Sequence, residues 1–506
     1  YEPDACTLLG CYRPQYAIDA KGNRTDFEFD NHHGKLLKKV EPVDADGNRR
    51  VTFHQYEADG FNRLEKTSQC GAPQNVAMTI TDCSGKTQLV TEYRYWQSTS
   101  LPLEVKTWDG VNSASNAVAI TTYAYDDAGH QTLTDGPLAG TDDASYSLYD
   151  AAGRTVWAIG AVNKAGKRPV THTTYRDQDN QALVTTTGYV NAVTPASYTA
   201  GYLQANFIAR SQTEQSYNPN GLPVMSKIND GGTTKQLTQI SYNDANQTEC
   251  TAVRMNPSNY GSLPGSACTL GAAGSQGQDR ITKAFYNALG QPIKTVKGLG
   301  TSEQLIDIEL GYTDNGQVAW RKDGNGNQTD YDYDGLDRLE RTTFPDGTYE
   351  QNTYDHNANP LSLRKRDGKL ISHSYDGLNL RQRTTVQNEQ GVQNEQDIVF
   401  DYDALGREAS VTCGSSTVST SYDGLGRQLT STTNGRTLSY QYNLAGQRTT
   451  LTQPNNRQVT YGYTTGGALS TIGTPGVGTL VTYDYDALGR IDTVSRGNGV
   501  VTTLNN

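Results

Sequence analysis

The sequence predicts an all-β protein, a long array of β-hairpins that forms a spiralling antiparallel sheet of the hollow-shell or β-solenoid-like kind. Three observations point to this fold class. One short sequence motif of six residues, called the word below, recurs along the chain. Turn signals separate segments of alternating residues that are rich in Thr, Val and Tyr. Only 35% of the 506 residues are hydrophobic. Tyrosines (32) far outnumber phenylalanines (8). Because tyrosine joins an apolar ring to a polar tip, this composition suits a sheet with polar surroundings on both faces.

The recurring word is clearest in YDALGR, which occurs at residues 402–407 and again at 485–490. Near-copies follow at a spacing of roughly 20 to 22 residues, and a period of this length defines the architecture before any local pattern does. The words begin at Tyr56, Tyr125, Tyr149, Tyr217, Tyr286, Tyr312, Tyr333, Tyr354, Tyr375, Tyr402, Tyr422, Tyr442, Tyr463 and Tyr485. The array therefore extends over nearly the whole chain.

Each word has the composition of a tight turn with a strand on either side. The fourth residue after the tyrosine is glycine in most copies and Asp337 or Asn379 in others, and these residue types tolerate a positive φ. An Asp or Asn after the tyrosine can accept hydrogen bonds from backbone N–H groups two residues on, which closes a turn. We therefore assign structural roles to Tyr149, Gly153, Tyr402, Asp403, Gly406, Tyr422, Asp423, Gly426, Tyr442, Gly446, Tyr485, Asp486 and Gly489. Their tyrosines are expected to stack at equivalent positions along one face of the sheet.

A second turn signal lies between successive words. It reads PDG at 345–347, DG at 367–368, NG at 434–435 and PNN at 454–456. Asn-Gly and Asp-Gly pairs between alternating residues indicate hairpins. Each repeat is therefore predicted to hold two short antiparallel strands.

Repeat regularity divides the chain into three parts. Residues 1–120 hold divergent repeats with cysteine-stapled loops, and residues 121–320 hold irregular repeats with insertions at about 190–215 and 250–280. Residues 321–506 hold regular repeats, which we expect to continue beyond the end of the chain. Within the first insertion, Leu203, Phe207 and Ile208 could line a short helix or could belong to irregular structure.

The full word Tyr-Asp-x-x-Gly-Arg occurs at Tyr149–Arg154, Tyr402–Arg407, Tyr422–Arg427 and Tyr485–Arg490, and a complete unit reads DGNGNQTDYDYDGLDRLERTTFPDG at 323–347. In these motifs, and over most of its length, the chain resembles the YD-repeat, or RHS-repeat, family of bacterial proteins, with teneurins and toxin-complex shells as distant relatives. The resemblance implies a spiralling antiparallel sheet that forms a large hollow shell. In many bacterial members this shell encloses a C-terminal toxin.

The chain departs from the family pattern at its ends. Family shells usually close with a plug segment that carries an aspartyl self-cleavage site, and no such segment is recognisable here. Residues 485–506 form an ordinary repeat without the Pro, inward charges or helical cap that would blunt a sheet edge. We therefore expect the chain to be a portion of a longer protein, whose missing parts or other copies cover this edge.

The cysteines fall into three close pairs and one single residue. We predict the disulfides Cys6–Cys11, Cys70–Cys83 and Cys250–Cys268, with Cys413 left as a thiol within a strand. Local disulfides that staple loops belong to an oxidising compartment. The alternative is a set of reduced thiols in a cytoplasmic precursor.

The sequence lacks a convincing metal site. A zinc site built from Cys6, Cys11, His32 and His33 would need a second cysteine pair nearby. We expect the two histidines to form a lengthened turn instead.

Residues 323–327 resemble the opening of a calcium loop, because Asp323, Asn325 and Asn327 alternate. Gln328 replaces the glycine that such a loop requires, and no terminal Glu follows. A polar hairpin turn is the expected structure.

Catalytic and cofactor patterns are equally weak. The GKT at residues 85–87 is not a phosphate loop, because Ile80 stands where that loop has a glycine. The repeated aspartates belong to turns, so the sequence predicts no catalytic residue, no cofactor and no metal. The net charge of −11, spread along the chain, argues against a nucleic-acid surface, and no apolar run approaches the ~20 residues that a membrane helix needs.

Two functions remain on this reading. The first is a non-enzymatic shell or scaffold, the encapsulating part of a secreted or surface-exposed bacterial polymorphic toxin. The second is an extracellular structural, filament-forming or adhesive protein that contacts cell-surface carbohydrate. The expected partners are a plug or toxin in the same polypeptide, or other copies of the chain.

Overall fold

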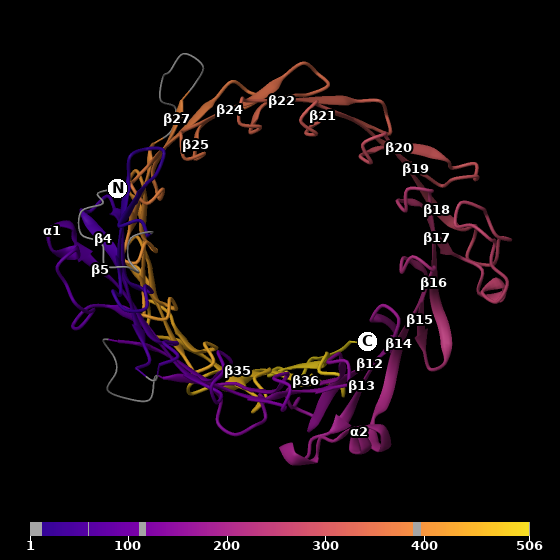
Figure 1. Cartoon of the computed structure of the whole chain (residues 1–506), viewed down its shortest axis with the longest axis horizontal. Helices are drawn as coiled ribbons and strands as arrows, with labels where there is room; N and C mark the ends of the chain where they lie inside the picture. Colours follow the sequence, from indigo (N-terminus) through magenta and orange to yellow (C-terminus); the bar gives the residue numbers. More distant parts are fainter. Residues whose placement is uncertain (1–12, 59, 111–117, 388–395, 505–506) are drawn as a thin grey trace. The chain divides into compact units, whose positions relative to one another are not determined.

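The computed structural model of the chain describes residues 13–58, 60–110, 118–387 and 396–504. Strands account for 54% and helices for 4% of the residues. Within the described ranges there are 38 strands, all in one antiparallel sheet in which hairpin follows hairpin (Figure 1). The predicted all-β fold and its antiparallel repeat array are confirmed.

The first strands are β1 (Tyr16–Ile18), β2 (Arg24–Phe29), β3 (Leu36–Val43), β4 (Asn48–Tyr56), β5 (Leu64–Pro73), β6 (Gln88–Tyr95), β7 (Pro102–Asp109), β8 (Ala119–Tyr125) and β9 (Gln131–Asp135). The middle strands are β10 (Ser145–Tyr149), β11 (Thr155–Ile159), β12 (Lys167–Arg176), β13 (Gln181–Asn191), β14 (Ile208–Tyr217), β15 (Pro223–Asp230), β16 (Thr233–Tyr242), β17 (Thr248–Arg254), β18 (Arg280–Tyr286), β19 (Pro292–Lys297), β20 (Leu305–Tyr312), β21 (Val318–Asp323), β22 (Gln328–Tyr333), β23 (Leu339–Thr343) and β24 (Tyr349–Tyr354).

The last strands are β25 (Pro360–Arg364), β26 (Leu370–Tyr375), β27 (Arg381–Gln387), β28 (Ile398–Tyr402), β29 (Glu408–Cys413), β30 (Ser416–Tyr422), β31 (Gln428–Thr433), β32 (Arg436–Tyr442), β33 (Arg448–Thr452), β34 (Gln458–Tyr463), β35 (Leu469–Thr474), β36 (Gly478–Tyr485), β37 (Ile491–Arg496) and β38 (Val501–Thr503). The helical elements are α1 (Gln74–Ala77), α2 (Ala200–Asn206) and the 3-10 turns Pro195–Ser197 and Pro257–Asn259.

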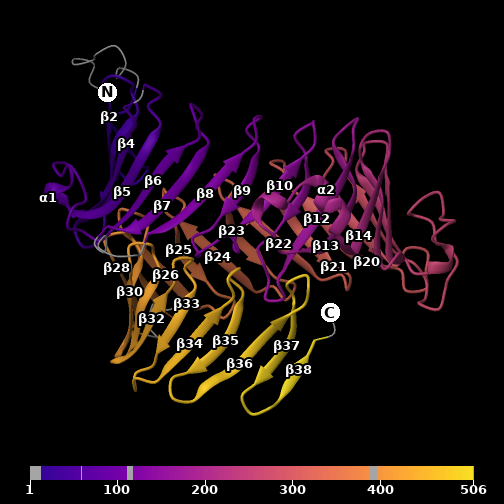
Figure 2. The same ribbon diagram turned by 90° about the horizontal axis from the view of Figure 1, so that it is seen from below.

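The chain divides into two compact units. Unit 1 holds residues 1–145, 161–165 and 353–506, and unit 2 holds residues 146–160 and 166–352. In unit 1 the late strands β28–β38 run alongside the early strands β2–β9, as the orange-to-yellow and indigo-to-violet ribbons of Figure 2 show. In unit 2 the strands β11 to β23 follow one another as a meander of hairpins.

Every regular word interrupts the strand pairing in the same way. The register between β28 and β29 shifts between Asp401 and Tyr402, and the register between β30 and β31 shifts between Ser421 and Tyr422. The shift is a β-bulge that precedes the turn of the word. It twists each hairpin at the point where the word begins.

The apolar core is small and local. One cluster lies where α1 packs on the sheet and consists of Val40, Val51, Ala72 and Ala77. A second lies beneath the insertion after β17 and consists of Cys250, Ala252, Ala267 and Ile281. Each cluster is covered by a loop that a disulfide holds on the sheet, because a single sheet layer offers no opposite layer to bury its apolar face.

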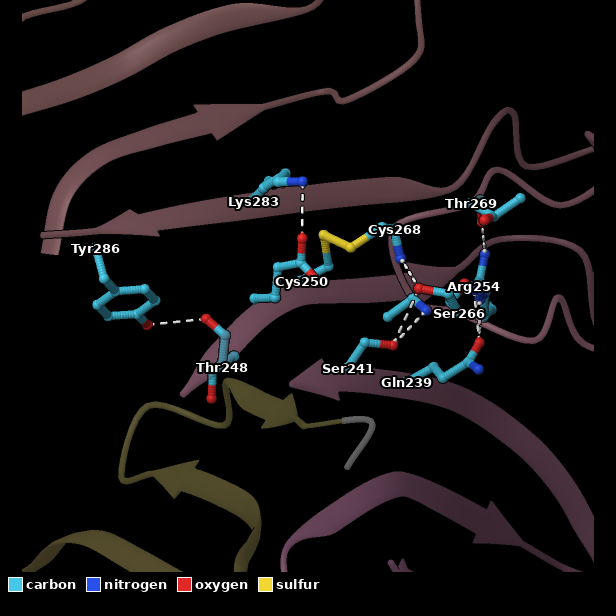
Figure 3. The surroundings of a disulfide bond; sticks show 12 residues. Gln239, Ser241, Thr248, Cys250, Arg254, Ser266, Cys268, Thr269, Lys283 and Tyr286 are labelled. Carbon is cyan, nitrogen blue, oxygen red and sulfur yellow. Dashed lines mark hydrogen bonds and ion pairs between the residues drawn. A yellow bond between two sulfur atoms is a disulfide. The ribbon is translucent and has the colours of Figure 1, made fainter. Parts of the chain in front are cut away.

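Both of these disulfides were predicted. Cys70 is bonded to Cys83, and Cys250 is bonded to Cys268 (Figure 3). Cys413 is an exposed free thiol. The predicted pair Cys6–Cys11 lies outside the described residues.

The first insertion, which the sequence left open between a short helix and irregular structure, is partly helical. Helix α2 forms at 200–206, and its Leu203 is fully buried. Phe207 ends the helix and packs edge-on against Trp157, with ring centroids 5.4 Å apart. Ile208 does not join the helix, because it begins β14 and is 47% exposed. Among the described residues, helices remain too short to cross a lipid bilayer.

Candidate functional site: the repeat turns and the seam

The word turns are closed by their own aspartates. In the copy at 402–407, Asp403 Oδ1 accepts the backbone N–H groups of Leu405 (2.9 Å) and Arg407 (3.0 Å), and its Oδ2 accepts Arg407 Nε at 2.7 Å. Gly406 has a φ of +77°. The copy at 485–490 repeats these bonds through Asp486. The aspartate therefore holds both the backbone of the turn and the arginine that ends the word.

In two words the hydrogen bonds also lower the pKa of the aspartate. At Asp334 the bond from the side chain of Arg338 lowers the pKa of the carboxyl below its ordinary value. At Asp486 burial raises the pKa, but the bonds from the backbone and side chain of Arg490 outweigh it and the pKa is lowered. These bonds therefore stabilise the ionised carboxylates of Asp334 and Asp486, which suits a structural role.

Neutral copies of the word use the same geometry. In three copies asparagine replaces aspartate and glutamine replaces arginine, and in one of them Asn443 Nδ2 donates to Gln447 Oε1 at 2.8 Å. The pairs Asn243–Gln247 and Asn287–Gln291 repeat this bond. In these copies Asp pairs with Arg and Asn with Gln, a correspondence between the second and last residues of the word that the sequence analysis did not identify.

Each tyrosine ties its word to the preceding one. Tyr402 OH donates to Arg381 O (2.8 Å), Tyr422 OH to Glu408 O (3.0 Å), Tyr442 OH to Gln428 O (2.8 Å) and Tyr485 OH to Leu469 O (2.6 Å). In every case the acceptor is the first residue of the strand that follows the previous word. Burial raises the pKa of Tyr402, Tyr442 and Tyr485, so these hydroxyls stay protonated as donors.

The same bond identifies words that the sequence did not reveal. Tyr95, Tyr175 and Tyr242 donate to Leu64 O, Thr155 O and Pro223 O. Of these, YNDANQ at Tyr242 fits the pattern, since Asn246 occupies the turn position with a φ of +60°. The other two have altered turns and carried no recognisable signal.

Arginines lie between the tyrosines of successive words. Arg407 is centred 4.8 Å from the ring of Tyr422, and Arg427 is centred 5.3 Å from the ring of Tyr442. Arg407 also donates to Asp423 O at 2.6 Å. The tyrosines occupy equivalent positions in successive words, and a cation–π contact with the intervening arginine links one word to the next.

Within unit 1, the late words also contact the early repeats. We call this set of contacts, between word turns at 355–487 and residues 19–163, the seam. Arg50 Nη1 donates to Leu405 O at 3.0 Å, and Gly424 N donates to Asp109 Oδ2 at 2.7 Å. Asn163 Nδ2 donates to Ala487 O at 3.0 Å. Successive word turns of the late strands therefore form hydrogen bonds with successive early repeats.

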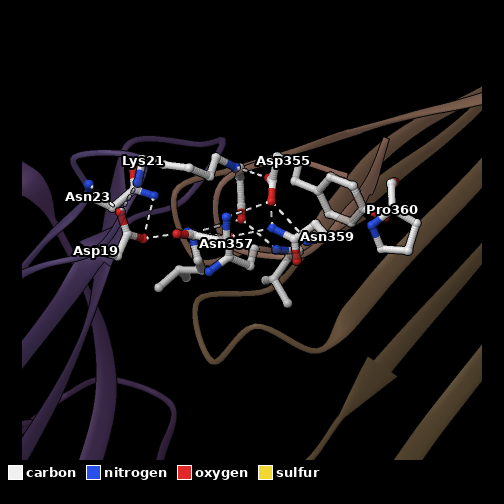
Figure 4. A network of polar contacts seen from close by, with 12 residues as sticks. Asp19, Lys21, Asn23, Asp355, Asn357, Asn359 and Pro360 are labelled. Atoms are coloured by element: carbon white, nitrogen blue, oxygen red, sulfur yellow. Dashed lines mark hydrogen bonds and ion pairs between the residues drawn. The ribbon is translucent and has the colours of Figure 1, made fainter. Parts of the chain in front are cut away.

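The first contact of the seam is a polar network, shown in Figure 4. Asn357 Nδ2 donates to Asp19 Oδ2 at 2.7 Å, and Lys21 pairs with Asp355 at 3.1 Å. Asp19 also accepts Asn23 Nδ2 at 2.8 Å. Polar side chains of the two turns thus hydrogen-bond and form an ion pair with one another.

Small residues let the turns approach so closely. A side chain at Gly424 would place its Cβ 2.4 Å from Gln88 O, and one at Gly377 would place it 2.5 Å from Val43 O. Gly335 occupies the same position of a word outside the seam, and there a Cβ would meet nothing within 4 Å. At Gly377 and Gly424 the glycine after the aspartate is therefore required for docking at the seam, and the example of Gly335 indicates that the turn itself does not need it.

One word of the seam lacks its arginine. In YDGLNL the residue that ends the word is Leu380, so no guanidinium of the word itself pairs with Asp376. Asp376 Oδ1 still accepts Leu378 N and Leu380 N, and the residue is only 6% exposed. Burial raises the pKa of Asp376, with a further contribution from the nearby charge of Asp44.

The metal candidates behave as turns. Asp323 Oδ1 accepts Asn325 N and Asn327 N, and Asp323 Oδ2 accepts Asn327 Nδ2. His32 and His33 lie in a turn whose backbone N–H groups are accepted by Asp30. In the part of the chain that the structure describes, no group of three His, Cys, Asp or Glu side chains is placed to hold a metal ion.

Comparisons with known proteins agree with this geometry. The profile of the Teneurin YD-shell family matches residues 351–480, which is 130 of the 506 residues. A comparison with curated protein sequences finds no match. The Tc holotoxin pore of Photorhabdus luminescens superposes with a TM-score of 0.63 at 13% identity, over 96% of this chain and 25% of that one. A crystal structure of TcdB2, TccC3 and Cdc42 superposes with a TM-score of 0.58 at 13% identity, over 93% of this chain and 27% of that one.

This chain thus spans about a quarter of the length of those polypeptides. At such identities the likeness concerns the fold. The family profile falls on the regular repeats at 351–480, and nearly all of the chain shares the fold of the toxin-complex polypeptides, so the similarity to YD-repeat, or RHS-repeat, shells lies in the fold and in these repeats.

Proposed function

We propose that the chain is a non-enzymatic scaffold, the repeat wall of a shell that encapsulates the toxin of a secreted or surface-exposed bacterial protein. The observation that carries this proposal is the seam. A wall that retains cargo needs neighbouring layers of sheet to join without gaps, and the seam joins late words to early repeats at successive positions. Backbone atoms take part in these contacts, as at Leu405 O and Gly424 N.

The chemistry of the word residues supports a scaffold rather than an enzyme. Their aspartates are committed to turn amides and arginines, and their tyrosines to backbone carbonyls. These groups therefore stabilise the wall.

The disulfides support a location outside the cytoplasm. Cys70–Cys83 and Cys250–Cys268 each hold a loop over a local core. Such bonds persist in oxidising compartments and are rare in the bacterial cytoplasm. We propose that the protein works in the secreted or surface-exposed state.

Protease protection in the natural polypeptide tests the encapsulation proposal. Under limited proteinase K digestion, segments outside residues 1–506 are expected to survive in the wild type and to be cut in a seam variant, Gly424→Trp. The matched control is Gly335→Trp, whose position has open space around it. Equal digestion in all three proteins would exclude encapsulation.

The sheet edges favour a second candidate, an extracellular filament or adhesive protein. In the described residues β1 pairs only with β2 and β38 only with β37, and Ile18 and Val501 are both 58% exposed. Unpaired edges are templates for further strands. Two observations together would support this candidate over the first. The full polypeptide would carry further repeats without a dissimilar cargo segment, and light scattering would detect polymers whose size depends on its length.

A further inference from the structure

Unit 1 contains a cavity of about 870 Å³ that the scaffold role does not use. Its floor is one face of strands β3 to β7. Its wall is the segment 78–84, which follows α1 and is held in place by the Cys70–Cys83 disulfide. A volume of this size falls in the range of about 300–1,000 Å³ that suits a small ligand.

Strand register builds the floor of the cavity as a straight row. Lys38 lies opposite Phe53, Phe53 opposite Ser68, Ser68 opposite Val90, and Val90 opposite Trp108. All five line the cavity. Because paired strands are about 4.8 Å apart, Phe53 and Trp108 stand roughly 14 Å apart with small side chains between them. The floor thus offers an aromatic surface at each end of a shallow trough.

Two lysines line the cavity, and they differ in their contacts. Lys38 is buried and donates to Met78 O (2.9 Å) and Ile80 O (2.8 Å), and burial lowers its pKa. Its ammonium group therefore fastens the wall to the floor. Lys66 is half-buried, and within the described part of the chain its Nζ meets the ring of Trp108, 5.7 Å from the centroid, with no carboxylate within ion-pair distance.

Among the described residues, the other charged groups around the cavity form no ion pair with Lys66. Glu92 lies opposite Lys66 in the register, but the two side chains are not within ion-pair distance of one another. Glu28 lies opposite Lys38, at the far end of the row. Asp82 Oδ1 accepts Ser84 N within the wall. Burial lowers the pKa of His54, so its imidazole is neutral at pH 7.

We propose that this cavity binds a small amphipathic anion, with its acid group on Lys66 and its apolar ring or chain along Trp108, Val90 and Phe53. A partly buried ammonium group without a carboxylate partner is stabilised by a ligand that supplies one. The neighbouring aromatic and aliphatic side chains supply the apolar contact area. The proposal does not depend on the encapsulation of a cargo.

Fluorescence titration with 8-anilinonaphthalene-1-sulfonate, an aromatic anion, tests the proposal on the full oxidised chain. We expect one saturable site, displaced by decanoate more effectively than by decanol or decylamine. Lys66→Gln should weaken binding by about tenfold, because it removes the cation that meets the acid group. Lys66→Arg keeps the charge and should retain binding.

The chain supplies a matched control. Lys322 lies over Trp320, with Nζ 5.6 Å from the ring centroid, on β21 and outside this cavity. Lys322→Gln should leave the titration unchanged. Circular dichroism and the melting temperature check that each variant is folded. Equal binding by the wild type and a folded Lys66→Gln variant, equal losses in Lys66→Gln and Lys322→Gln, or equal displacement by decanoate and decanol would each overturn the proposal.

Discussion

Gly424 donates its backbone N–H to Asp109 Oδ2 at 2.7 Å, although 315 positions separate the two residues in the sequence. Asp109 is 7% exposed, so its carboxylate is a buried acceptor at the seam. The bond connects the word that follows β30 to the end of β7. It makes the late words part of the same folded unit as the early repeats.

Loss of this acceptor should loosen the seam. Asp109→Ala leaves a buried N–H without its partner, and we expect unit 1 to lose about 1–3 kcal/mol of unfolding free energy in urea titration. Hydrogen exchange should also accelerate in peptides that contain Gly424. The control is Asp177→Ala, which removes an exposed partner of Arg154 and should cost less than about 1 kcal/mol. Unchanged exchange at Gly424 in Asp109→Ala would contradict the role of the bond.

Substitutions at three glycines should distinguish the stability effect of docking at the seam from the effect of turn geometry. Gly424→Ala should destabilise unit 1 by about 1–3 kcal/mol, because its Cβ would stand 2.4 Å from Gln88 O. Gly426→Ala should cost about 1–2 kcal/mol for a different reason, since Gly426 has open space but a φ of +80°. Gly335→Ala should be neutral. Thermal melts of the three variants suffice, and a similar loss in Gly335→Ala would sink the docking explanation.

The contributions of Asp376 and Asp486 to the stability of unit 1 should change with pH in opposite directions. The pKa of Asp376 is raised by burial, so its ionised form is disfavoured in the folded state. Stability should therefore rise as the pH falls through the raised folded pKa toward the ordinary value of about 3.9. Asp376→Asn should stabilise unit 1 at pH 7 and remove that rise.

Asp486 has a lowered pKa, so its contribution is present above about pH 3.9 and is lost as the pH falls through the folded pKa. Asp486→Asn should therefore destabilise unit 1 at pH 7 and matter little in strong acid. Melting temperatures of both variants between pH 7 and pH 3 check the pair. Parallel profiles for the two variants would show that the missing arginine at Leu380 has no electrostatic consequence.

Within a word, an Asp–Arg side-chain pair should be replaceable by an Asn–Gln pair. Asp403→Asn and Arg407→Gln, each alone, leave one mismatched partner and should each cost about 1–3 kcal/mol. The double variant recreates the pair found in Asn443 and Gln447 and should recover part of the loss. A double-mutant cycle in urea measures the coupling, and strict additivity would show that the two letters act independently.

The disulfide of unit 2 should stabilise the insertion after β17. Replacing Cys250 and Cys268 with alanine should lower the unfolding free energy of unit 2 by roughly 2–4 kcal/mol. Mass spectrometry of the unreduced chain after alkylation should find one modified thiol, at Cys413. Three or more modified cysteines would contradict both the pairing and the secreted location.

The repeat turns were predictable because their letters act locally. A glycine at positive φ and an aspartate that accepts nearby amides leave a pattern within six residues, as at Asp403 and Gly406. The seam was not predictable, since the sequence does not tell which early residue Gly424 will meet. Tyr95 and Tyr175 escaped detection because their turns are altered while their distant hydroxyl contacts are kept. Ile208 was ambiguous because a short apolar run fits a helix and a strand equally well.

The tyrosine bonds and the seam together restrict how such a chain can change its length. Removal of residues 403–422, one whole repeat, would let Tyr442 and Tyr485 keep acceptors at the start of their own neighbouring strands. The same deletion would move every later word one place along the early repeats, so that Asp109 would face a turn that normally lies elsewhere. If the late strands of unit 1 gain or lose a repeat, the early strands must therefore gain or lose one as well. Natural length variants of this protein should differ by repeats gained or lost on both sides of the seam together.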